Sequence, residues 1–353
     1  MEDDPLDISL PLPYRLSILI VGGVWLWGFA LQLVKPLAQL VGHPHGQQTH
    51  QTTYTFASIL TGPLVLSVLF WSAVTNIENA ATWRFLPNVT LLLVILKFVP
   101  LHIKGLPLPR AGLSRFWSSL KRVSIGGLAK QDEPRFGDVL LADALTSYAR
   151  PIAALYVAFC MFLPSRHTQK DVSTMPGAFY IIPALAAYPF AIRFRQCLLS
   201  RQPANAIKYM TAFPPIIVGA MMSYSDHAID GSGYIQYWWV FFAVVNSGYS
   251  LWWDIFVDWD LWMISSAPHH RNQTRIMGLT TRCVLIVIVD SILRFTWLGK
   301  LSARLDIYEY KEKTVFLLEM LEVMRRWMWL LFRAETEWLR KRGENIELSP
   351  QLG

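Results

Sequence analysis

Charged side chains interrupt an apolar and aromatic run, Thr314 to Trp338, that is otherwise long enough to cross a bilayer. On insertion scales each arginine at the midplane costs roughly 2.5 to 3.5 kcal/mol, so these charges must face protein, water or a ligand. At helical spacing Glu322, Arg326 and Arg333 fall on one face, and Arg325 lies about 100° around the helix from Arg326. We interpret this polar stripe as one wall of an anion pathway.

Two upstream stretches carry charges in equally apolar surroundings. The stretch SGYSLWWDIFVDWDLW places Asp254 and Asp258 at i and i+4, on one helix face among aromatic neighbours. Two carboxylates in such surroundings require cations. The stretch DSILRFTW offers Asp290 and Arg294 at i and i+4, with Trp297 three residues beyond the arginine.

Charges also mark earlier apolar segments. In FGDVLLADALTSYARP, Asp143 and Arg150 are seven residues apart and share a helix face. Arg193 in RFRQC and Lys208 in NAIKY lie near the ends of predicted spans. Either cation can snorkel to the interface, and this interpretation stays open beside a buried role.

The residues allow two interpretations of these charges. They form interhelical salt bridges with no ligand, or they line an anion path. Arginine exceeds what the nearby carboxylates neutralise if Glu319 and Glu337 lie at the ends of their helix. Because guanidinium groups present forked donors to carboxylate or phosphate, we favour an oxyanion over a cation or a proton.

Composition indicates what must position these residues. Of 353 residues, 53% are hydrophobic and only 16% are charged, which is typical of a polytopic membrane protein. We predict an all-α transmembrane bundle of about nine spans with no soluble domain. The candidate spans are 16–34, 56–75, 87–103, 138–163, 178–197, 205–224, 234–257, 281–298 and 314–334. Breaks are expected where glycine or proline interrupts a span: Gly62, Pro63, Pro151, Pro183, Pro189, Pro214 and Pro215.

Lysine and arginine set the orientation, since cytoplasmic loops hold their excess. The linker 104–137 and the tail are rich in both, which places the C-terminus in the cytoplasm and the N-terminus outside. The loop 299–313 is an exception, because it carries four basic residues on the outer side. Within the linker, LSRFWSSLKRV is an interfacial amphipathic helix or a plain basic connection. The predicted regions are 1–137, a six-span core at 138–340 and a tail at 341–353.

Other reactive residues give no sign of catalysis. There is no Walker A motif and no Ser, His, Asp arrangement in a polar setting, so we expect no enzyme and no cofactor. His43, His45 and His50 are better explained by a polar loop than by a metal site. The three cysteines lie in or beside apolar runs, without metal-like spacing.

Taken together and in order, the charged segments resemble the EXS family. The likeness covers roughly residues 134 to 340, and a looser likeness extends over the first three spans. The matching stretches are FGDVLLADAL, RFRQCL, NAIKY, LWWDIFVDWDLW, DSILRFTW and LEVMRRWMWLLFRAETEWL. The resemblance implies a phosphate path through the membrane core, with Trp297 as a gate. Its cations would be Arg193, Lys208, Arg294, Arg325, Arg326 and Arg333, and their charge partners Asp143, Asp254, Asp258, Asp290 and Glu322.

In layout the chain looks like short members of this family, which lack the soluble inositol-phosphate sensor and reside in the Golgi. The resemblance then implies a multi-pass Golgi membrane protein that moves inorganic phosphate from lumen to cytosol and supports glycosylation and enzyme retention. The alternative is a non-transporting scaffold that sorts Golgi glycosyltransferases. Candidate partners besides phosphate and lipid are a cytoplasmic sorting adaptor, the glycosyltransferases and a second copy of the chain. No nucleic acid is expected.

Overall fold

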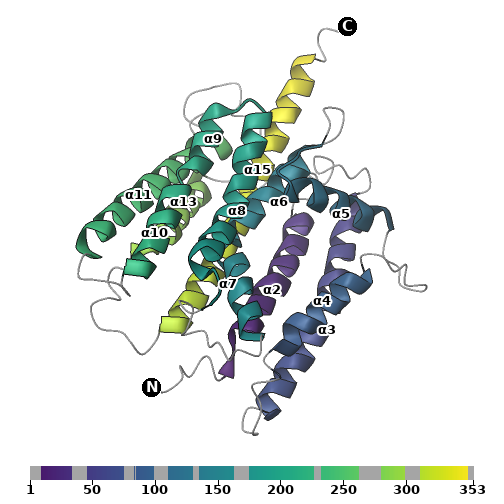
Figure 1. Cartoon of the computed structure of the whole chain (residues 1–353). Helices are drawn as coiled ribbons and strands as arrows, with labels where there is room; N and C mark the ends of the chain where they lie inside the picture. The colour runs from purple at the N-terminus through teal and green to yellow at the C-terminus, as the bar shows by residue number, and fades with distance from the viewer. Residues whose placement is uncertain are drawn as a thin grey trace.

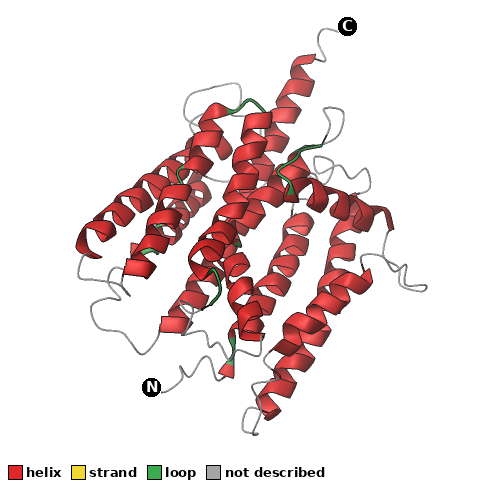
Figure 2. Cartoon of the chain, in the orientation of Figure 1, coloured by secondary structure: helices red, strands yellow, loops and turns green. Residues whose placement is uncertain are grey.

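The computed structural model is a bundle of helices, and no strand occurs among the residues that it describes (Figure 2). These are residues 9–33, 46–74, 83, 85–98, 110–129, 135–162, 175–225, 232–261, 280–298 and 311–348. The helices are α2 (Leu12–Leu33), α3 (Gly46–Val74), α4 (Leu86–Phe98), α5 (Arg110–Ser124), α6 (Phe136–Ser147), α7 (Ala149–Phe162), α8 (Ala178–Leu199), α9 (Pro203–Met210), α10 (Phe213–Ser225), α11 (Ser232–Trp253), the π-helical turn η4 (Asp254–Asp258), α13 (Thr280–Arg294) and α15 (Lys311–Leu348). The predicted all-α class is confirmed.

Three helical segments are long and apolar enough to cross a membrane: Leu12–Leu33, Thr53–Val74 and Tyr234–Asp258. A fourth span arises if α6 and α7, which meet at an angle of 59°, count as one. The described parts of α4, α10 and α13 are 13 to 15 residues long, and α15 carries many charges. The protein is therefore an all-α membrane protein, whereas about nine spans remains a prediction.

The helix α15 is the central element of the bundle. It is 38 residues long and packs against α2, α6, α13 and η4 (Figure 1). Its aromatic residues Trp327 and Trp329 belong to one buried cluster with Trp259, and Trp27 of α2 contacts Trp327 edge-on at 5.4 Å. This central position explains why an apolar helix can carry arginines, since protein and not lipid surrounds them.

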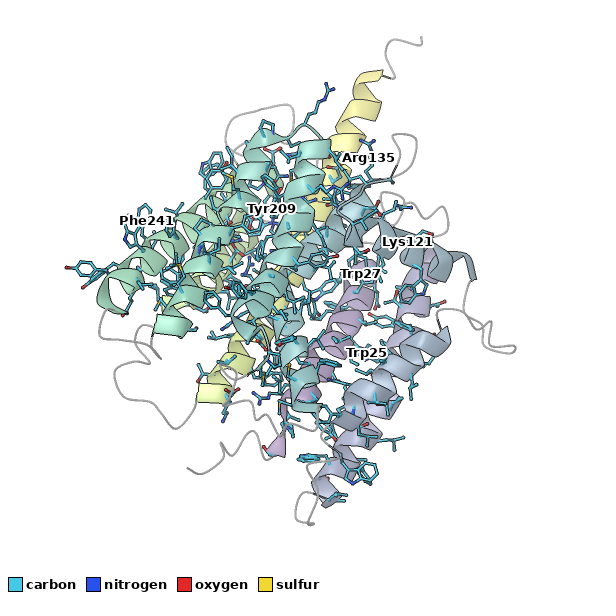
Figure 3. The ribbon with its side chains drawn as sticks, viewed as in Figure 1. Trp25, Trp27, Lys121, Arg135, Tyr209 and Phe241 are labelled. Atoms are coloured by element: carbon cyan, nitrogen blue, oxygen red, sulfur yellow. The ribbon has the colours of Figure 1, made fainter. Side chains whose placement is uncertain are left out.

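The outer faces of the bundle are apolar. Phe241 of α11 is half exposed and lies on the outside, whereas Tyr209 lies within the bundle (Figure 3). On α3 the exposed side chains include Leu66 and Leu69. Lipid tails are the natural surroundings for such faces.

Two predicted spans are each divided into two helices. The span 138–163 is broken at Tyr148, between α6 and α7, and the span 205–224 is broken at 211–212, between α9 and α10. The nearby prolines follow the breaks: Pro151 is in the first turn of α7, as Pro214 and Pro215 are in that of α10. A proline in the first turn costs no backbone hydrogen bond, so these positions suit a helix start.

The other predicted breaks are wrong. Pro63 lies inside α3, and Pro183 and Pro189 lie inside α8, yet both helices continue through them. In a membrane protein neighbouring groups can satisfy the carbonyl that a proline frees.

The basic linker contains a real helix. The helix α5 lies across one end of the bundle, beside the end where α15 finishes (Figure 1). We call this the linker end. Val123 of α5 is fully buried against Ala142 of α6 and Ile192 of α8, while Lys121 is exposed. The helix is thus anchored to the bundle, and its predicted place at the membrane interface stays a prediction.

Candidate functional site

The buried charges form one connected chain, which we call the charge ladder. Its centre is Lys208 on α9, whose Nζ lies 2.8 Å from Oδ1 of Asp254 and 3.2 Å from Oδ2 of Asp258. Both carboxylates come from η4. The predicted α-helical spacing is wrong in detail, because the N–H of Trp259 bonds the Asp254 carbonyl five residues back at 2.9 Å. Both side chains nevertheless face the same lysine.

The ladder continues to α13 and α15. Arg294 contacts Asp254, and its Nε lies 3.4 Å from Oδ2 of Asp290. Arg325 lies 3.1 Å from the other oxygen of Asp290 and 2.6 Å from Oε1 of Glu322. Asp254 and Asp290 are both fully buried, and each contacts two cations. The attraction of these cations offsets the free-energy cost of removing the two carboxylates from water.

The other end of the ladder is weaker. Arg333 lies 3.4 Å from Oδ1 of Asp258 and 3.9 Å from Oε2 of Glu337. In order, the members are Glu337, Arg333, Asp258, Lys208, Asp254, Arg294, Asp290, Arg325 and Glu322. Four cations alternate with five carboxylates, so the ladder itself carries no surplus of positive charge.

Arg326 lies outside this neutralised chain. Its Nε donates to Oγ of Ser147 at 3.0 Å, and its Nη2 donates to Oγ1 of Thr146 at 2.9 Å. Within the part of the chain that the structure describes, it forms no ion pair with a carboxylate. Its guanidinium stacks over Trp329 at 4.9 Å, and the indole N–H of Trp329 is buried with no acceptor among the described residues. This is a half-buried cation with unused donors.

A second buried ion pair joins α6 and α8. Arg193 lies 2.6 Å from Oδ1 of Asp143, and Tyr209 donates its hydroxyl proton to the same oxygen at 2.5 Å. The guanidinium also stacks over the Tyr209 ring at 4.9 Å. Because Lys208 precedes Tyr209 on α9, this pair and the ladder approach each other on the same short helix.

The predicted gate residue is held among aromatic side chains. Trp297, just after α13, donates its indole N–H to Oγ of Ser247 on α11 at 3.0 Å. Its ring meets Trp239 edge-on at 5.6 Å. The side chain therefore joins the end of α13 to α11, and its role as a gate stays a prediction.

The structure brings most of the predicted site together and corrects two expectations. Lys208 and Arg193 are both buried, which rules out snorkelling. Asp143 faces Arg193, and the predicted shared face with Arg150 is wrong, because the bend at Tyr148 leaves Arg150 exposed. The predicted arginine excess is wrong for these residues, since Glu337 reaches the ladder and the five carboxylates of the ladder equal its four cations plus Arg326.

Neutral polar residues complete the site and were not predicted. They are Thr146, Ser147, Gln196 and Tyr209. Ser147 also donates to Oε1 of Glu322 at 2.9 Å, so one hydroxyl joins Glu322 and Arg326. The adjacent hydroxyl residues Thr146 and Ser147, shortly before Pro151, were the available signal in the sequence. Such hydroxyls are a weak signal, because in apolar helices they often bond only their own backbone.

These observations define an all-α membrane protein whose interior is organised around a buried charge ladder and an adjacent arginine, Arg326, that forms no ion pair among the described residues. The chain belongs to the EXS family, whose model matches residues 10–339. The match covers the segments that resemble the family between residues 134 and 339, and it also covers the first three predicted spans, where the likeness is looser.

Named relatives agree with this family. Protein ERD1 homolog 1 of Schizosaccharomyces pombe is 30% identical over 269 residues, which cover 69% of each chain. Protein ERD1 homolog 2 of the same yeast is 26% identical, over 94% of this chain and 97% of its own. Phosphate transporter PHO1 homolog 8 of Arabidopsis thaliana is 28% identical, over 59% of this chain and 28% of its own.

Proposed function

We propose that this protein moves inorganic phosphate across the Golgi membrane, from lumen to cytosol. The observation that carries the proposal is Arg326, a half-buried cation that uses two of its five donors on hydroxyls and none on a carboxylate among the described residues. A phosphate oxygen accepts such donors strongly, and an arginine can offer two of them in parallel. The buried N–H of Trp329 beside it adds another unused donor.

The charge ladder fits a conducting role. Each of its cations is fixed by two carboxylates, so these side chains do not have to reorganise when an anion arrives. The same pairing weakens their attraction for the anion. A pathway needs binding that is strong enough for entry and weak enough for release. In this proposal Arg326 captures phosphate, and Lys208, Arg294, Arg325, Arg333 and Arg193 line the path as cations whose charge is cancelled by their carboxylate partners.

The Golgi address and the direction rest on the likeness to other members of the family. Two ERD1 homologs match most of this chain, and a plant relative is named a phosphate transporter. Return of phosphate from the lumen would support glycosylation and, through it, retention of Golgi enzymes. No reaction is catalysed in this proposal, and no cofactor takes part.

The direct test is phosphate flux into liposomes that contain the purified protein. Replacing Arg326→Ala should lower the flux about 10- to 100-fold, because a charge-assisted hydrogen bond contributes roughly 1.5 to 3 kcal/mol. The matched control is Arg150→Ala, which removes an exposed arginine of α7 and should leave the flux within twofold.

Equal flux in Arg326→Ala and the parent would overturn the proposed capture site. Absence of phosphate flux in the parent protein, with intact retention of Golgi enzymes in cells, would instead favour the sorting scaffold. Sulfate and chloride measured in the same liposomes report the selectivity.

A further inference from the structure

The end of the linker is tied to the bundle by an unusual number of backbone contacts. We call residues 122–129 the linker strap. Three donors on α8 hold three of its carbonyls: Tyr188 bonds that of Ser124, Arg195 that of Ile125, and Gln196 that of Gly127. The strap is thereby bound along one side of α8.

The opposite side of the strap is bound to α6. The backbone N–H of Ala129 donates to Oδ2 of Asp138 at 2.9 Å, and Arg122 contacts both oxygens of the same carboxylate at 3.1 and 3.2 Å. Arg135 donates to the Ala129 carbonyl at 2.9 Å. Asp138, which is fully buried, therefore fixes both ends of the strap.

A glycine allows the strap to turn between these anchors. Gly126 has a φ of +68°, a backbone conformation that residues other than glycine rarely adopt. A Cβ added at this position would lie 2.9 Å from Cδ of Arg195. The turn thus brings the strap backbone directly against α8.

One of the three donors on α8 differs from the others, because it also contacts the buried ion pair. Gln196 donates its Nε2 proton to the Gly127 carbonyl at 2.9 Å, and its Oε1 accepts from Nη1 of Arg193 at 2.7 Å. The orientation of this amide is forced, since arginine can only donate and a carbonyl can only accept. Gln196 is 1% exposed, so its amide is shielded from bulk solvent.

We propose that Gln196 is a positioning residue that couples the linker strap to Arg193. When the strap is docked, the amide holds the Arg193 guanidinium against Asp143 and Tyr209. When the strap leaves, the amide loses its carbonyl partner and is free to turn, which changes the donors that Arg193 presents to the pathway. The linker thereby sets the anion affinity at this end, a consequence that rests on the proposed phosphate function.

The first experiment measures strap docking without phosphate. Ala129, which is 3% exposed, is replaced by cysteine in a chain whose Cys160, Cys197 and Cys283 are changed to alanine, and its reaction with a maleimide is timed in detergent. Gln196→Met has similar volume but forms neither bond, and it should raise the labelling rate about tenfold. The control Gln202→Met alters an exposed glutamine that contacts Asn205, and it should leave the rate unchanged.

An unchanged labelling rate in Gln196→Met would overturn the coupling. If that variant does not give monodisperse protein, Gln196→Glu serves, since it keeps an acceptor for Arg193 and loses the donor to the Gly127 carbonyl. It should raise the labelling rate in the same way, and an unchanged rate would again count against the proposal.

The second experiment separates positioning from stability. In liposomes Gln196→Met should raise the apparent KM for inorganic phosphate at least threefold, with maximal flux within twofold of the parent. A loss of maximal flux at constant KM would mean damage to the fold and would overturn the positioning role. A parent protein without phosphate flux refutes the proposed function, and the maleimide experiment then decides the coupling alone.

Discussion

Arg325 and Arg326 are neighbours in sequence and opposites in environment. Arg325 is 4% exposed and is neutralised by Glu322 and Asp290, whereas Arg326 is half-buried and contacts hydroxyls and an aromatic face. The difference follows from helix geometry, since a rotation of about 100° turns one guanidinium toward α13 and the other toward α6. Two adjacent arginines of one helix therefore have different partners: Arg325 is held by carboxylates of the ladder, whereas Arg326 is held by hydroxyls, and only Arg326 is the proposed capture site.

Lys208 is the residue on which the ladder depends most for stability. Replacing Lys208→Met leaves Asp254 and Asp258 with one cation each, and removing one partner of a buried pair costs roughly 3 to 5 kcal/mol. We expect the midpoint of thermal unfolding in detergent to fall by several degrees. Lys121→Met, on the exposed side of α5, is the control and should be nearly neutral.

A second substitution checks that the loss is electrostatic. Adding Asp258→Asn to Lys208→Met removes the charge of one of the two carboxylates that lost the lysine. The double variant should therefore recover part of the lost stability. If the two substitutions lower the midpoint additively, the ladder does not act as a coupled unit.

Charged residues in apolar segments predicted the ladder, whereas the neutral polar residues around it could not be identified from the sequence. Asp254, Arg294 and Arg325 were identified because each is costly in lipid, which leaves burial in protein as the economical solution. Tyr209 and Gln196 carry no such cost. Tyr209 bonds Asp143 on α6, and Gln196 bonds the Gly127 carbonyl in the linker, so the packing of the bundle is needed to reveal these contacts.

The bend between α6 and α7 depends on close packing against α2. The Tyr148 hydroxyl, at the bend, donates to the Leu19 carbonyl at 3.0 Å, and a Cβ on Gly23 would lie 1.8 Å from the hydroxyl oxygen. Ser147 and Thr146, which hold Arg326, immediately precede this bend. The small residue on α2 therefore helps to fix the site from a neighbouring helix.

Two adjacent glycines of α2 provide a matched test of this packing. Gly23→Ala should force Tyr148 from its place and destabilise the protein by about 1 to 3 kcal/mol. Gly22→Ala meets nothing within 4 Å and should be neutral or stabilising by up to about 1 kcal/mol, since alanine favours a helix. Thermal unfolding of both variants in one detergent compares them. Equal midpoints would mean that the bend does not need the close approach.

Helix class and the limits of several helices were predictable, but the effect of each proline on its helix was not. Apolar length and composition predict spans, and α2, α8 and α11 begin and end within a few residues of the predicted limits. Whether a proline kinks, ends or merely occupies a helix depends on what satisfies the freed carbonyl, and that group comes from another part of the chain. Pro63 and Pro214 look alike in sequence, yet one lies inside a helix and the other follows a break.

The linker and the tail lie at one end of the bundle. The helix α5 and the C-terminal end of α15 lie at the linker end, whereas α2 and α15 both begin at the opposite end (Figure 1). Arg340, in the C-terminal part of α15, donates to the Val257 carbonyl at 3.0 Å and lies 3.6 Å from Asp260. Exposed Lys121 belongs to the same end. This common end is the one that the excess of basic residues assigns to the cytoplasm.

The orientation can be measured in sealed vesicles from cells that express tagged protein. A C-terminal tag should be removed by added protease, and a cysteine introduced as Lys121→Cys should react with an impermeant maleimide from the same side. An N-terminal tag should resist the protease until detergent opens the vesicles, because an odd number of crossings puts the termini on opposite sides. If protease removes both tags from sealed vesicles, the number of crossings is even. If Lys121→Cys is protected from the maleimide while the C-terminal tag is cleaved, the linker and the tail lie on opposite sides of the membrane, which would contradict the shared end.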